Sequence, residues 1–530
     1  MSCEKYGVEF PKTGKNRRST INFHLRLLAE LLGSSNALDD FVLENQSSYR
    51  HKYSPFFVKL MEKSLESSQK ALEIAEKGIH FVESNLVFIR KNGESVPLKQ
   101  EFATNNENFF ATKTCFGDKA HARSTNHFDG FFVEYNGKKL SRKSLFEQID
   151  NWAHSGVMER DAEKALISLI FSNGKDFSTG EFESLEGHVF VMIGAGSAMG
   201  PFNTLIALGA TVVAIDIPRP NLWDKLKSKA ASSKGTLIYP SHVDRNSGAE
   251  IAGCDILRRP AQVLNWLSTL DLKGKKVTVG NYTYLDGSLH VLLSAVADQI
   301  VDGFCRRFDG VVNVAFLGTP TDVSVIPEEA FYAARENYSN LRFGRLAEML
   351  IHLFTLKKQL RRNDIVEVGK RHLYNGLIVE QGPNYALAKM IQLWRAVIHS
   401  QKSKRGRVSL NVAPATATKS VISNANFRLA FKGRPYFKPL ETFDERTSSS
   451  LMAGLLLHDI LKIGTGQKQT ENAILIKSQQ SVHGGAWRCA YSVFVAKFIV
   501  NTNIVKHPSI ISVLSSIIYA SLRRNIFLDA

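Results

Sequence analysis

The sequence predicts an α/β fold, a doubly wound parallel sheet preceded by an additional mainly helical N-terminal region. Helical periodicity dominates residues 1–185, and short β-branched or apolar segments alternate with helical patterns from Glu186 onward. Strands that alternate with helices are typical of a parallel sheet with helical crossovers. The third observation is a set of glycines that follows the first apolar segment, at Gly194, Gly196 and Gly200.

The composition is that of an ordinary globular protein with a large core, since 44% of the 530 residues are hydrophobic and 22% are charged. The formal net charge is +17. Its lysines and arginines are dispersed in pairs, whereas a nucleic-acid groove needs a clustered basic stripe interleaved with aromatic residues. We therefore predict a solvated basic surface and no nucleic-acid partner, although the charge also suits anionic cofactors or membrane surfaces.

Cysteine usage and the N-terminal composition predict a soluble cytoplasmic protein. The five cysteines lie far apart and no pair has metal-ligand spacing, so we expect free thiols in a reducing compartment and no metal site. The N-terminus lacks the apolar core of a secretory signal, and no run approaches the roughly 18 to 20 apolar residues that cross a bilayer. We expect no membrane span.

The N-terminal region is predicted to be helical because residues 55–78 and 141–171 repeat apolar side chains at three- and four-residue steps. Between them, residues 85–99 predict a β-hairpin with Asn92 and Gly93 in its turn. We assign this region no catalytic role.

The region from residue 186 onward is predicted to form the sheet. Residues 188–194 are the first strand, 201–209 the following helix and 210–216 the second strand. Further strands of the same sheet are predicted at residues 235–239, 309–316, 364–369 and 407–414. After about residue 440 the pattern weakens, and one helix is predicted over residues 441–462.

Residues 272–290 are predicted to be an inserted β-hairpin, because side chains alternate in polarity before a turn at Leu285, Asp286 and Gly287. Such a hairpin can cap a substrate pocket or pack on the N-terminal region, and the sequence does not choose between these placements. Residues 481–492 are interpreted as a Gly-Gly turn that carries a buried tryptophan rather than as a ligand site.

The glycine loop allows two interpretations, a tight strand-to-helix turn or a cradle for a nucleotide phosphate. Its context favours the phosphate, because the loop follows a strand and opens a helix whose free backbone N–H groups suit an anion. Asp216 ends the next strand, 22 residues after Gly194, and can accept hydrogen bonds from a ribose. A carboxylate there repels a 2′-phosphate, which favours NAD over NADP, a preference that Arg219 can soften.

In this loop the chain resembles the short-chain dehydrogenase/reductase family, whose pattern is TGxxxGxG. The matching residues are 193–200, in which isoleucine replaces the leading threonine and Ala198 the middle glycine. The resemblance implies a Rossmann-like fold, an NAD or NADP cofactor and redox chemistry at a hydroxyl or carbonyl carbon. It implies five cofactor contacts in the loop, at Gly194, Gly196, Ser197, Met199 and Gly200.

Three later segments resemble family segments in the same order along the chain. Residues 254–256 are similar to the acidic segment beside the adenine, which implies a contact by Asp255. Residues 308–318 are similar to the D-x-L-V-N-N-A-G strand, and residues 407–420 to the R-V-N-x-V-x-P-G-x-x-x-T segment after the sixth strand. The cofactor contacts that these two segments imply are Asn313, Ala315, Pro414 and Thr418.

The family uses a tyrosine and a lysine four residues apart, and Tyr385 and Lys389 match this pair in a segment with helical periodicity. Four residues are about one helical turn, so both side chains share a face. A free phenol has a pKa of about 10, and we expect the adjacent ammonium to lower it so that Tyr385 exchanges a proton with the substrate. The resemblance further implies that Lys389 binds the nicotinamide ribose. Tyr135 and Lys139 have the same spacing, but we expect no cofactor site near them.

Two other family residues are matched less well. The family's water-holding asparagine, in the helix before the tyrosine, corresponds to Asn340, which we prefer to Asn337. The family's serine, one strand upstream of the tyrosine, has no counterpart because residues 363–384 contain neither serine nor threonine. His372 or Tyr374 are candidate replacements, since losing one donor to a developing oxyanion typically costs about 10²- to 10³-fold in rate.

We predict three parts, a mainly helical domain over residues 1–185, a dinucleotide-binding Rossmann domain over 186–440 and a C-terminal extension over 441–530. The predicted function is NAD(P)-dependent oxidation or reduction of a hydroxyl or carbonyl group on a small-molecule substrate. Two alternatives are a non-redox NAD-using epimerase or dehydratase and a catalytically silent NAD(P)-binding sensor or scaffold. The substrate and the oligomeric state stay open, a homo-oligomer included.

Overall fold

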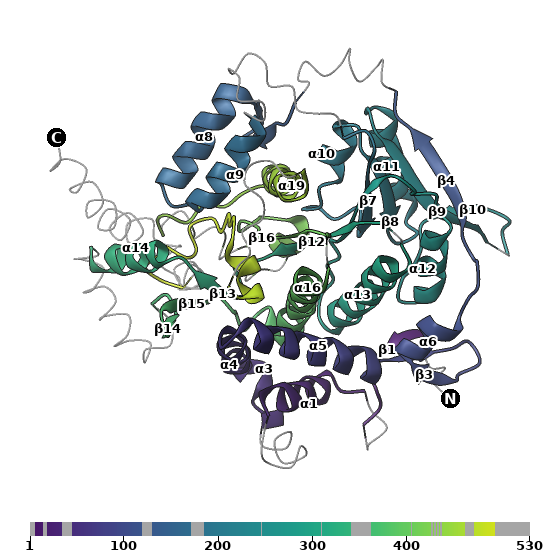
Figure 1. Ribbon diagram of the computed structural model, residues 1–530, viewed down its shortest axis with the longest axis horizontal. Helices are drawn as coiled ribbons and strands as arrows, with labels where there is room; N and C mark the ends of the chain where they lie inside the picture. The colour runs from purple at the N-terminus through teal and green to yellow at the C-terminus, as the bar shows by residue number, and fades with distance from the viewer. Residues whose placement is uncertain are drawn as a thin grey trace.

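A mostly parallel sheet of eight strands lies at the centre of a mixed α/β fold (Figure 1). Helices lie on both sides of the sheet, so the α/β class that the sequence predicts is confirmed. The computed structural model describes residues 6–13, 18–33, 45–118, 130–170, 185–340, 362–461 and 471–492, apart from positions 245, 309 and 404 and several between 424 and 436.

The order of the strands reverses at the centre of the sheet, between β7 and β11. The parallel strands are β7 (His188–Ile193), β8 (Thr211–Ile215), β9 (Thr236–Val243), β11 (Lys276–Asn281), β12 (Val312–Gly318) and β16 (Val408–Val412). From β7 the chain adds β8 and β9 on one side, and from β11 it adds β12 and β16 on the other. β10 (Glu250–Ala252) and β4 (Ala111–Phe116) pair antiparallel with β9. In open α/β sheets, ligands bind in the crevice where the order reverses.

Strand β7 shows how the sheet is buried on both faces. All six of its residues are buried, and alternate side chains enter two hydrophobic clusters. Val189 and Val191 pack with one set of helices, whereas Phe190 and Met192 pack with the other. The first set is α12 (Pro260–Ser268), α13 (Ser288–Arg307) and α16 (Gly382–Lys402), and the second is α10 (Phe202–Ala207), α11 (Pro220–Ala231) and α19 (Glu445–Leu461). A continuous apolar strand is expected where both faces of a parallel sheet are covered.

The predicted helices and hairpin of the N-terminal region are confirmed. Its helices are α1 (Thr20–Leu32), α3 (Tyr49–Lys52), α4 (Ser54–Leu65), α5 (Ser68–Asn85), α6 (Leu98–Thr104), α8 (Arg142–His154) and α9 (Arg160–Ile170). Its strands are β1 (Gly7–Glu9), β2 (Val87–Ile89) and β3 (Ser95–Pro97), with a second hairpin at β5 (Val133–Tyr135) and β6 (Lys138–Leu140). The turn between β2 and β3 places Gly93 at a φ of 84°, a conformation that favours glycine.

These N-terminal elements share the core of the sheet. Helix α5 lies along α16, and α9 packs against α19 on the opposite face (Figure 1). Strand β4 lengthens the sheet by pairing with β9. The segment before residue 185 therefore contributes a strand and covers both faces, although its composition differs from that of the sheet region.

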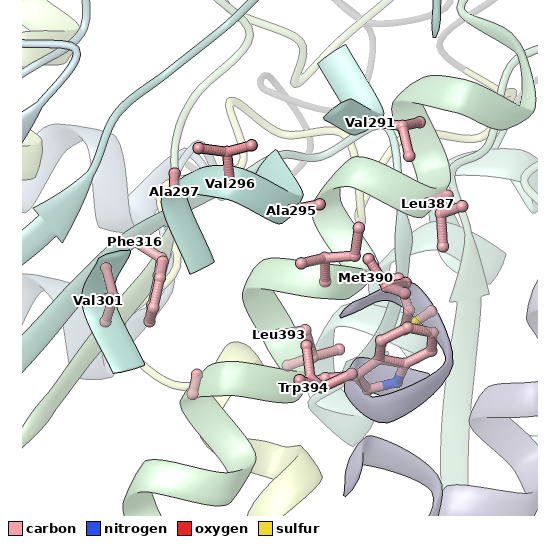
Figure 2. Packing of buried hydrophobic residues seen from close by; sticks show 14 of the residues in the cluster. Val291, Ala295, Val296, Ala297, Val301, Phe316, Leu387, Met390, Leu393 and Trp394 are labelled. Carbon is pink, nitrogen blue, oxygen red and sulfur yellow. The ribbon is translucent and has the colours of Figure 1, made fainter. Parts of the chain in front are cut away.

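Helix α16 is enclosed by α13 on one side and by α5 on the other. Figure 2 shows Leu387, Met390 and Trp394 of α16 in the hydrophobic cluster that also holds Val291 of α13. The indole of Trp394 lies over Gly78 of α5, where a Cβ would be 2.6 Å from the ring. Glycine at this position allows the two helices to approach closely.

The hairpin predicted over residues 272–290 is wrong. Residues 276–281 form β11, which pairs in parallel with β7 and β12, and α13 begins at Ser288. Thr278 and Gly280 resemble outward-facing positions in the sequence, yet both are buried because helices cover this strand on both sides. The predicted turn is the N-terminal cap of α13, with Gly287 at a φ of 64°.

Among the residues that the structure describes, α13 is the one helix long and apolar enough to span a membrane by length and composition alone. Of its 18 most apolar consecutive residues, 72% are buried inside the protein, and the helix packs against α12 and α16. Its apolar character is therefore explained by its place in the core.

The strand predicted at residues 364–369 exists but belongs to another sheet. Strands β13 (Val323–Ile326), β14 (Ile365–Val368) and β15 (Arg371–Asn375) form an antiparallel sheet in the order β13-β15-β14, beside α14 (Glu328–Ser339). Gly369, at a φ of 60°, and Lys370 form the turn between β14 and β15. Two residues can close an antiparallel hairpin but cannot supply the long crossover that a parallel neighbour requires.

The C-terminal extension packs on the sheet. Among its described residues the regular elements are α19 and the short 3₁₀ helix η2 (Ala473–Ser478), whereas α17 (Lys419–Ser423) precedes residue 441. The predicted α19 helix is confirmed, and η2 contacts α16, β13 and β16. The predicted turn is also confirmed, with Gly484 and Gly485 at φ values of 67° and 83° and Trp487 fully buried.

Four cysteines lie among the described residues and all are unpaired, and burial raises the pKa of Cys489 to about 12.

We expect Gly78→Ala to destabilise the protein, although alanine is the better helix former by about 1 kcal/mol. The added Cβ would overlap the Trp394 ring, and overpacking of this kind costs about 1–3 kcal/mol. Chemical denaturation measures the difference, with Gln69→Ala at an exposed position of α5 as the control, expected within about 0.5 kcal/mol of the wild type. A Gly78→Ala protein more stable than the wild type would contradict the close packing of α5 on α16.

Candidate active site

The carboxyl ends of β7, β11 and β12 meet where the strand order reverses, and each is followed by residues suited to binding or catalysis. The glycine loop 194–200 follows β7, residues 282–284 follow β11, and residues 319–322 follow β12. Helix α16, which carries Tyr385 and Lys389, packs against β12 and β16. The segments therefore lie at one edge of the sheet, where α/β proteins bind ligands.

The glycine loop is exposed at Gly196 and Ala198 and packs against the end of β11 at Gly194. Gly194 has a φ of 84°, and a Cβ there would lie 3.0 Å from the backbone N of Thr283. A Cβ on Gly196 would lie 2.3 Å from Cδ1 of Leu222. The φ of Gly194 and its backbone contact require glycine there, whereas at Gly196 the nearest atom is the end of the Leu222 side chain, which can move aside.

Several backbone N–H groups of the loop are used within the protein. The N–H of Gly194 donates to Ile215 O at 2.8 Å, that of Ser197 to Gly194 O at 3.0 Å, and that of Gly200 to Ser197 O at 3.0 Å. The helix that follows, α10, has only six residues. The loop therefore offers an anion fewer donors than its sequence predicts, and its exposed stretch around Ala198 is the part open to a ligand.

Asp216 lies beside the loop, as the sequence predicts. Its Oδ2 accepts a hydrogen bond from the Gly196 N–H and its Oδ1 from the Ile217 N–H, both at 2.8 Å. Burial raises the pKa of the carboxyl group, whereas these bonds and the Arg219 guanidinium lower it. Each carboxylate oxygen keeps lone-pair capacity for a further donor such as a ribose hydroxyl.

Asp255, Pro414 and Thr418 also lie at this edge of the sheet. The Cys254 N–H donates to the backbone oxygen of Asp216 at 2.8 Å, so Asp255 adjoins the predicted ribose-binding carboxylate. Pro414 and Thr418 follow the carboxyl end of β16, and both are buried.

The structure does not bring Asn313, Ala315 or Asn340 to the loop. Asn313 is the second residue of β12, at its amino end, where its Oδ1 accepts from the Arg407 N–H at 2.9 Å. Ala315 is buried in the middle of the same strand. Asn340 caps the exposed end of α14, which lies beside the small sheet in Figure 1.

The order of the strands explains the position of Asn340. Strand β11 lies directly beside β7. Residues 312–318 form β12, one strand further from β7, so the helix next to α16 is α13 rather than α14. Asn340 was predicted because α14 precedes Tyr385 in the sequence, but the helix packed along α16 is α13.

Tyr385 and Lys389 lie on one face of α16, as their spacing predicts. The Nζ of Lys389 is 6.0 Å from the centroid of the Tyr385 ring. It donates hydrogen bonds to Leu317 O at 3.0 Å and to Gln392 Oε1 at 3.3 Å. The lysine therefore bridges α16 and the end of β12.

The expectation that Lys389 lowers the pKa of Tyr385 is wrong. Burial raises the pKa of Tyr385 to about 12 and lowers that of Lys389 to about 8. Desolvation disfavours the charged form of each group, and at this site it dominates. Tyr385 is therefore protonated at neutral pH. Lys389, with a pKa of about 8, loses its proton just above neutral pH.

Two hydroxyl groups that were not predicted from the sequence form hydrogen bonds with Tyr385. Thr319 and Thr321 are hydrogen-bonding partners of the phenol that lower its pKa, and their Oγ1 atoms are 3.0 Å apart. They follow β12 directly, whereas residues 363–384, in which a serine was expected, lie largely in the small sheet. The Thr-Pro-Thr segment after a predicted strand was a usable signal, but the serine was expected in residues 363–384, just upstream of the tyrosine.

Other residues that the sequence left open have packing roles. His372 stacks on Phe331 with ring centroids 3.9 Å apart, and Tyr374 is buried in the small sheet. Tyr135 and Lys139 lie on the two strands of the β5–β6 hairpin rather than on one helix face. None of these four sequence candidates shares the surroundings of Tyr385.

The turn between β11 and α13 connects the glycine loop to Tyr385. Its Thr283 backbone lies against Gly194, and the ring of Tyr284 is 6.1 Å from that of Tyr385 between centroids. His290 is 5.5 Å from Tyr385 on the same measure, and neither of its ring nitrogens has a hydrogen-bond partner of normal geometry. Burial, with the Lys389 cation, lowers the pKa of His290 to about 3, so its imidazole is neutral.

Two cavities are lined by other parts of the chain. One of about 830 Å³ is lined by Tyr135 and Arg488 among others, and one of about 380 Å³ by Phe109 and Arg259 among others. No predicted cofactor or catalytic residue lines either of them. Neither cavity is the predicted cofactor cleft.

Comparisons of the chain with models of known protein families, with curated protein sequences and with solved structures found no match. The functional interpretation therefore depends on the motifs and on the geometry of this edge.

We expect Asp216→Ala to loosen the glycine loop, because it removes the acceptor of the Gly196 N–H. A hydrogen bond to a charged group contributes about 1.5–3 kcal/mol. Hydrogen–deuterium exchange should become faster across residues 194–200, and Asp255→Ala, which leaves both Asp216 bonds in place, is the control. Unchanged exchange in Asp216→Ala would show that this carboxylate does not hold the glycine loop in place.

Proposed function

We propose that the protein is an NAD(P)-dependent oxidoreductase that interconverts a hydroxyl and a carbonyl group on a small molecule, on a Rossmann-like fold similar to that of short-chain dehydrogenases/reductases. The observation that carries the proposal is the position of Tyr385 and Lys389. They lie one turn apart on α16, at the sheet edge that also holds the glycine loop and Asp216. The strand order, with its reversal beside β7, supports a doubly wound dinucleotide-binding sheet.

The residues at this edge suit a dinucleotide with an unphosphorylated ribose. The exposed backbone around Ala198 would contact the diphosphate, and Asp216 would accept hydrogen bonds from the adenosine ribose. Asp255 would border the adenine. The negative charge of Asp216 disfavours a 2′-phosphate, so the proposed cofactor is NAD rather than NADP.

Reduction of a carbonyl group suits the protonation states of the site. The cofactor would supply the hydride. The Tyr385 hydroxyl, protonated at neutral pH, would give its proton to the carbonyl oxygen as the carbon accepts the hydride, and the phenolate would regain a proton from water. Thr319 and Thr321 would donate hydrogen bonds to the same oxygen, the role that serine has in the family.

A catalytically silent dinucleotide-binding protein is the second candidate. The glycine loop supports it, because its N–H groups donate largely to acceptors inside the protein, including Asp216. A silent protein binds NAD through the same edge but leaves carbonyl substrates unchanged. Binding and turnover therefore have to be measured separately.

NAD is expected to raise the melting temperature of the wild-type protein, and Ala198→Asp to abolish this rise. A ligand at about 100 times its Kd stabilises a protein by about 2.7 kcal/mol, and a carboxylate at the exposed position 198 repels the diphosphate. Ala198→Ser, which adds a neutral group, is the control and should retain the rise. If NAD has no effect on the wild type, or the same effect on Ala198→Asp, the proposed cofactor site is refuted.

For the chemistry, we expect Tyr385→Phe to keep the stabilisation by NAD and to lose the NADH-dependent reduction of a panel of ketones and aldehydes, followed by NADH absorbance. Thr319→Val should slow the reduction by about 10²- to 10³-fold, because it removes a donor to the developing oxyanion. Thr269→Val, at the C-cap of α12, where the hydroxyl donates to Trp266 O, is the control. NAD binding without turnover of any carbonyl compound by the wild type would favour the silent protein.

A further inference from the structure

The C-terminal extension places a lysine beside the candidate site. Lys477 of η2 is 3% exposed, and its Nζ forms an ion pair with Oδ2 of Asp322, which is also 3% exposed. The same Nζ donates to Val323 O at 2.8 Å, while Oδ1 of Asp322 accepts from the Val323 N–H at 2.8 Å. Both charges are therefore compensated at close range in the interior.

Asp322 ends the short segment that contacts both candidate catalytic side chains. Along residues 317–322, Leu317 O accepts from Lys389, the hydroxyls of Thr319 and Thr321 act on Tyr385, and Asp322 meets Lys477.

Gly376 closes over the same segment. Its N–H donates to Asp322 O at 3.1 Å, and a Cβ on it would lie 2.2 Å from Pro320 O. The segment is thus held from both sides, by α16 and by the small sheet, and η2 anchors its end through Lys477.

We propose that Lys477 and Asp322 are positioning residues of the candidate site, because their ion pair holds residues 317–322 against α16 and sets the charge that Lys389 faces. The effect of the two charges on Lys389 is independent of the proposed function, whereas its consequence for catalysis rests on that function. In this arrangement the C-terminal extension is a structural part of the site.

The titratable groups around Lys389 come from three neighbouring elements. Asp322 lies on the segment after β12 and Lys477 on η2, while the cation of Lys389 itself faces His290 of α13, whose imidazole is neutral. Besides burial, Asp322 raises the pKa of Lys389 and Lys477 lowers it. Because the two partners have opposite signs, removing one or the other should move the ionisation of Lys389 in opposite directions.

The test measures the titration of Lys389 in the full-length protein without a cofactor. Lysines are reductively methylated with ¹³C-formaldehyde, and the Lys389 signal is assigned by its loss in Lys389→Arg. Asp322→Asn leaves the Lys477 cation uncompensated, so the Lys389 pKa should fall below its wild-type value of about 8. Lys477→Gln leaves the Asp322 carboxylate uncompensated, so the Lys389 pKa should rise.

Two controls separate this effect from general loss of stability. Glu159→Gln breaks a buried ion pair with Arg488, which does not act on Lys389, and should leave the titration of Lys389 unchanged. Lys477→Arg keeps the ion pair with Asp322, so Lys389 should titrate in this variant as it does in the wild type. Shifts of Lys389 in the same direction in both single variants, or no shift in either, overturn the proposal.

A buried unpaired charge can prevent folding, so the double variant Asp322→Asn with Lys477→Gln provides a second test. It buries neither charge, and the two opposing effects on Lys389 should largely cancel. A Lys389 shift in the double variant larger than that of a folded single variant would also overturn the proposal. Titration with NAD on the same samples keeps the two questions apart, because failure to bind NAD refutes the proposed function and leaves the Lys389 result intact.

Discussion

The candidate site depends on one constraint, the fixed position and rotation of helix α16 against α13 and α5. Arg395 of this helix donates to both carboxylate oxygens of Asp298 on α13, at 2.7 and 2.8 Å, and both side chains are buried. On a second side, Trp394 lies over Gly78 of α5. A helix held on two sides cannot rotate about its axis, so its first turns present Tyr385 to the carboxyl ends of the strands. The bidentate contact also fixes the register of α16 against α13.

The regions outside the sheet complete this arrangement. Helix α5 comes from the N-terminal region and η2 from the C-terminal extension, and both pack on α16. On the other face, the hydroxyl of Ser449 in α19 donates to the Gly200 backbone oxygen at 2.7 Å, which fixes the end of the glycine loop. Parts of the chain that look like additions in the sequence therefore support both halves of the candidate site.

Burial controls the ionisation of the site more strongly than pairing does. Tyr385, Lys389 and His290 all shift toward their neutral forms, because His290 is buried and Tyr385 and Lys389 are partly buried, and desolvation dominates at each group. A sequence-based argument considers the four-residue spacing of tyrosine and lysine and expects attraction between their charged forms. The spacing specifies a shared helix face, but it contains no information on how much of that face water reaches.

Local patterns were sufficient for the elements and for part of the site. Periodicity identified α4, α5, α8, α9 and α19, and strand-helix alternation identified the sheet, because both depend on neighbours within a few residues. The closeness of Asp216 to the glycine loop was also predictable, since consecutive parallel strands end at the same edge.

Tertiary structure alone decided which strand lies beside β7 and hence which hydroxyls reach Tyr385. The buried strand β11 contains Thr278 and Gly280, so its pattern resembled a half-exposed hairpin until helices covered both of its faces. Pairing between strands that are distant in the chain has no local signature, and neither has the meeting of Lys477 with Asp322 across 155 residues. Such contacts are selected by the packing of the whole core, which is why the elements were predictable and their neighbours were not.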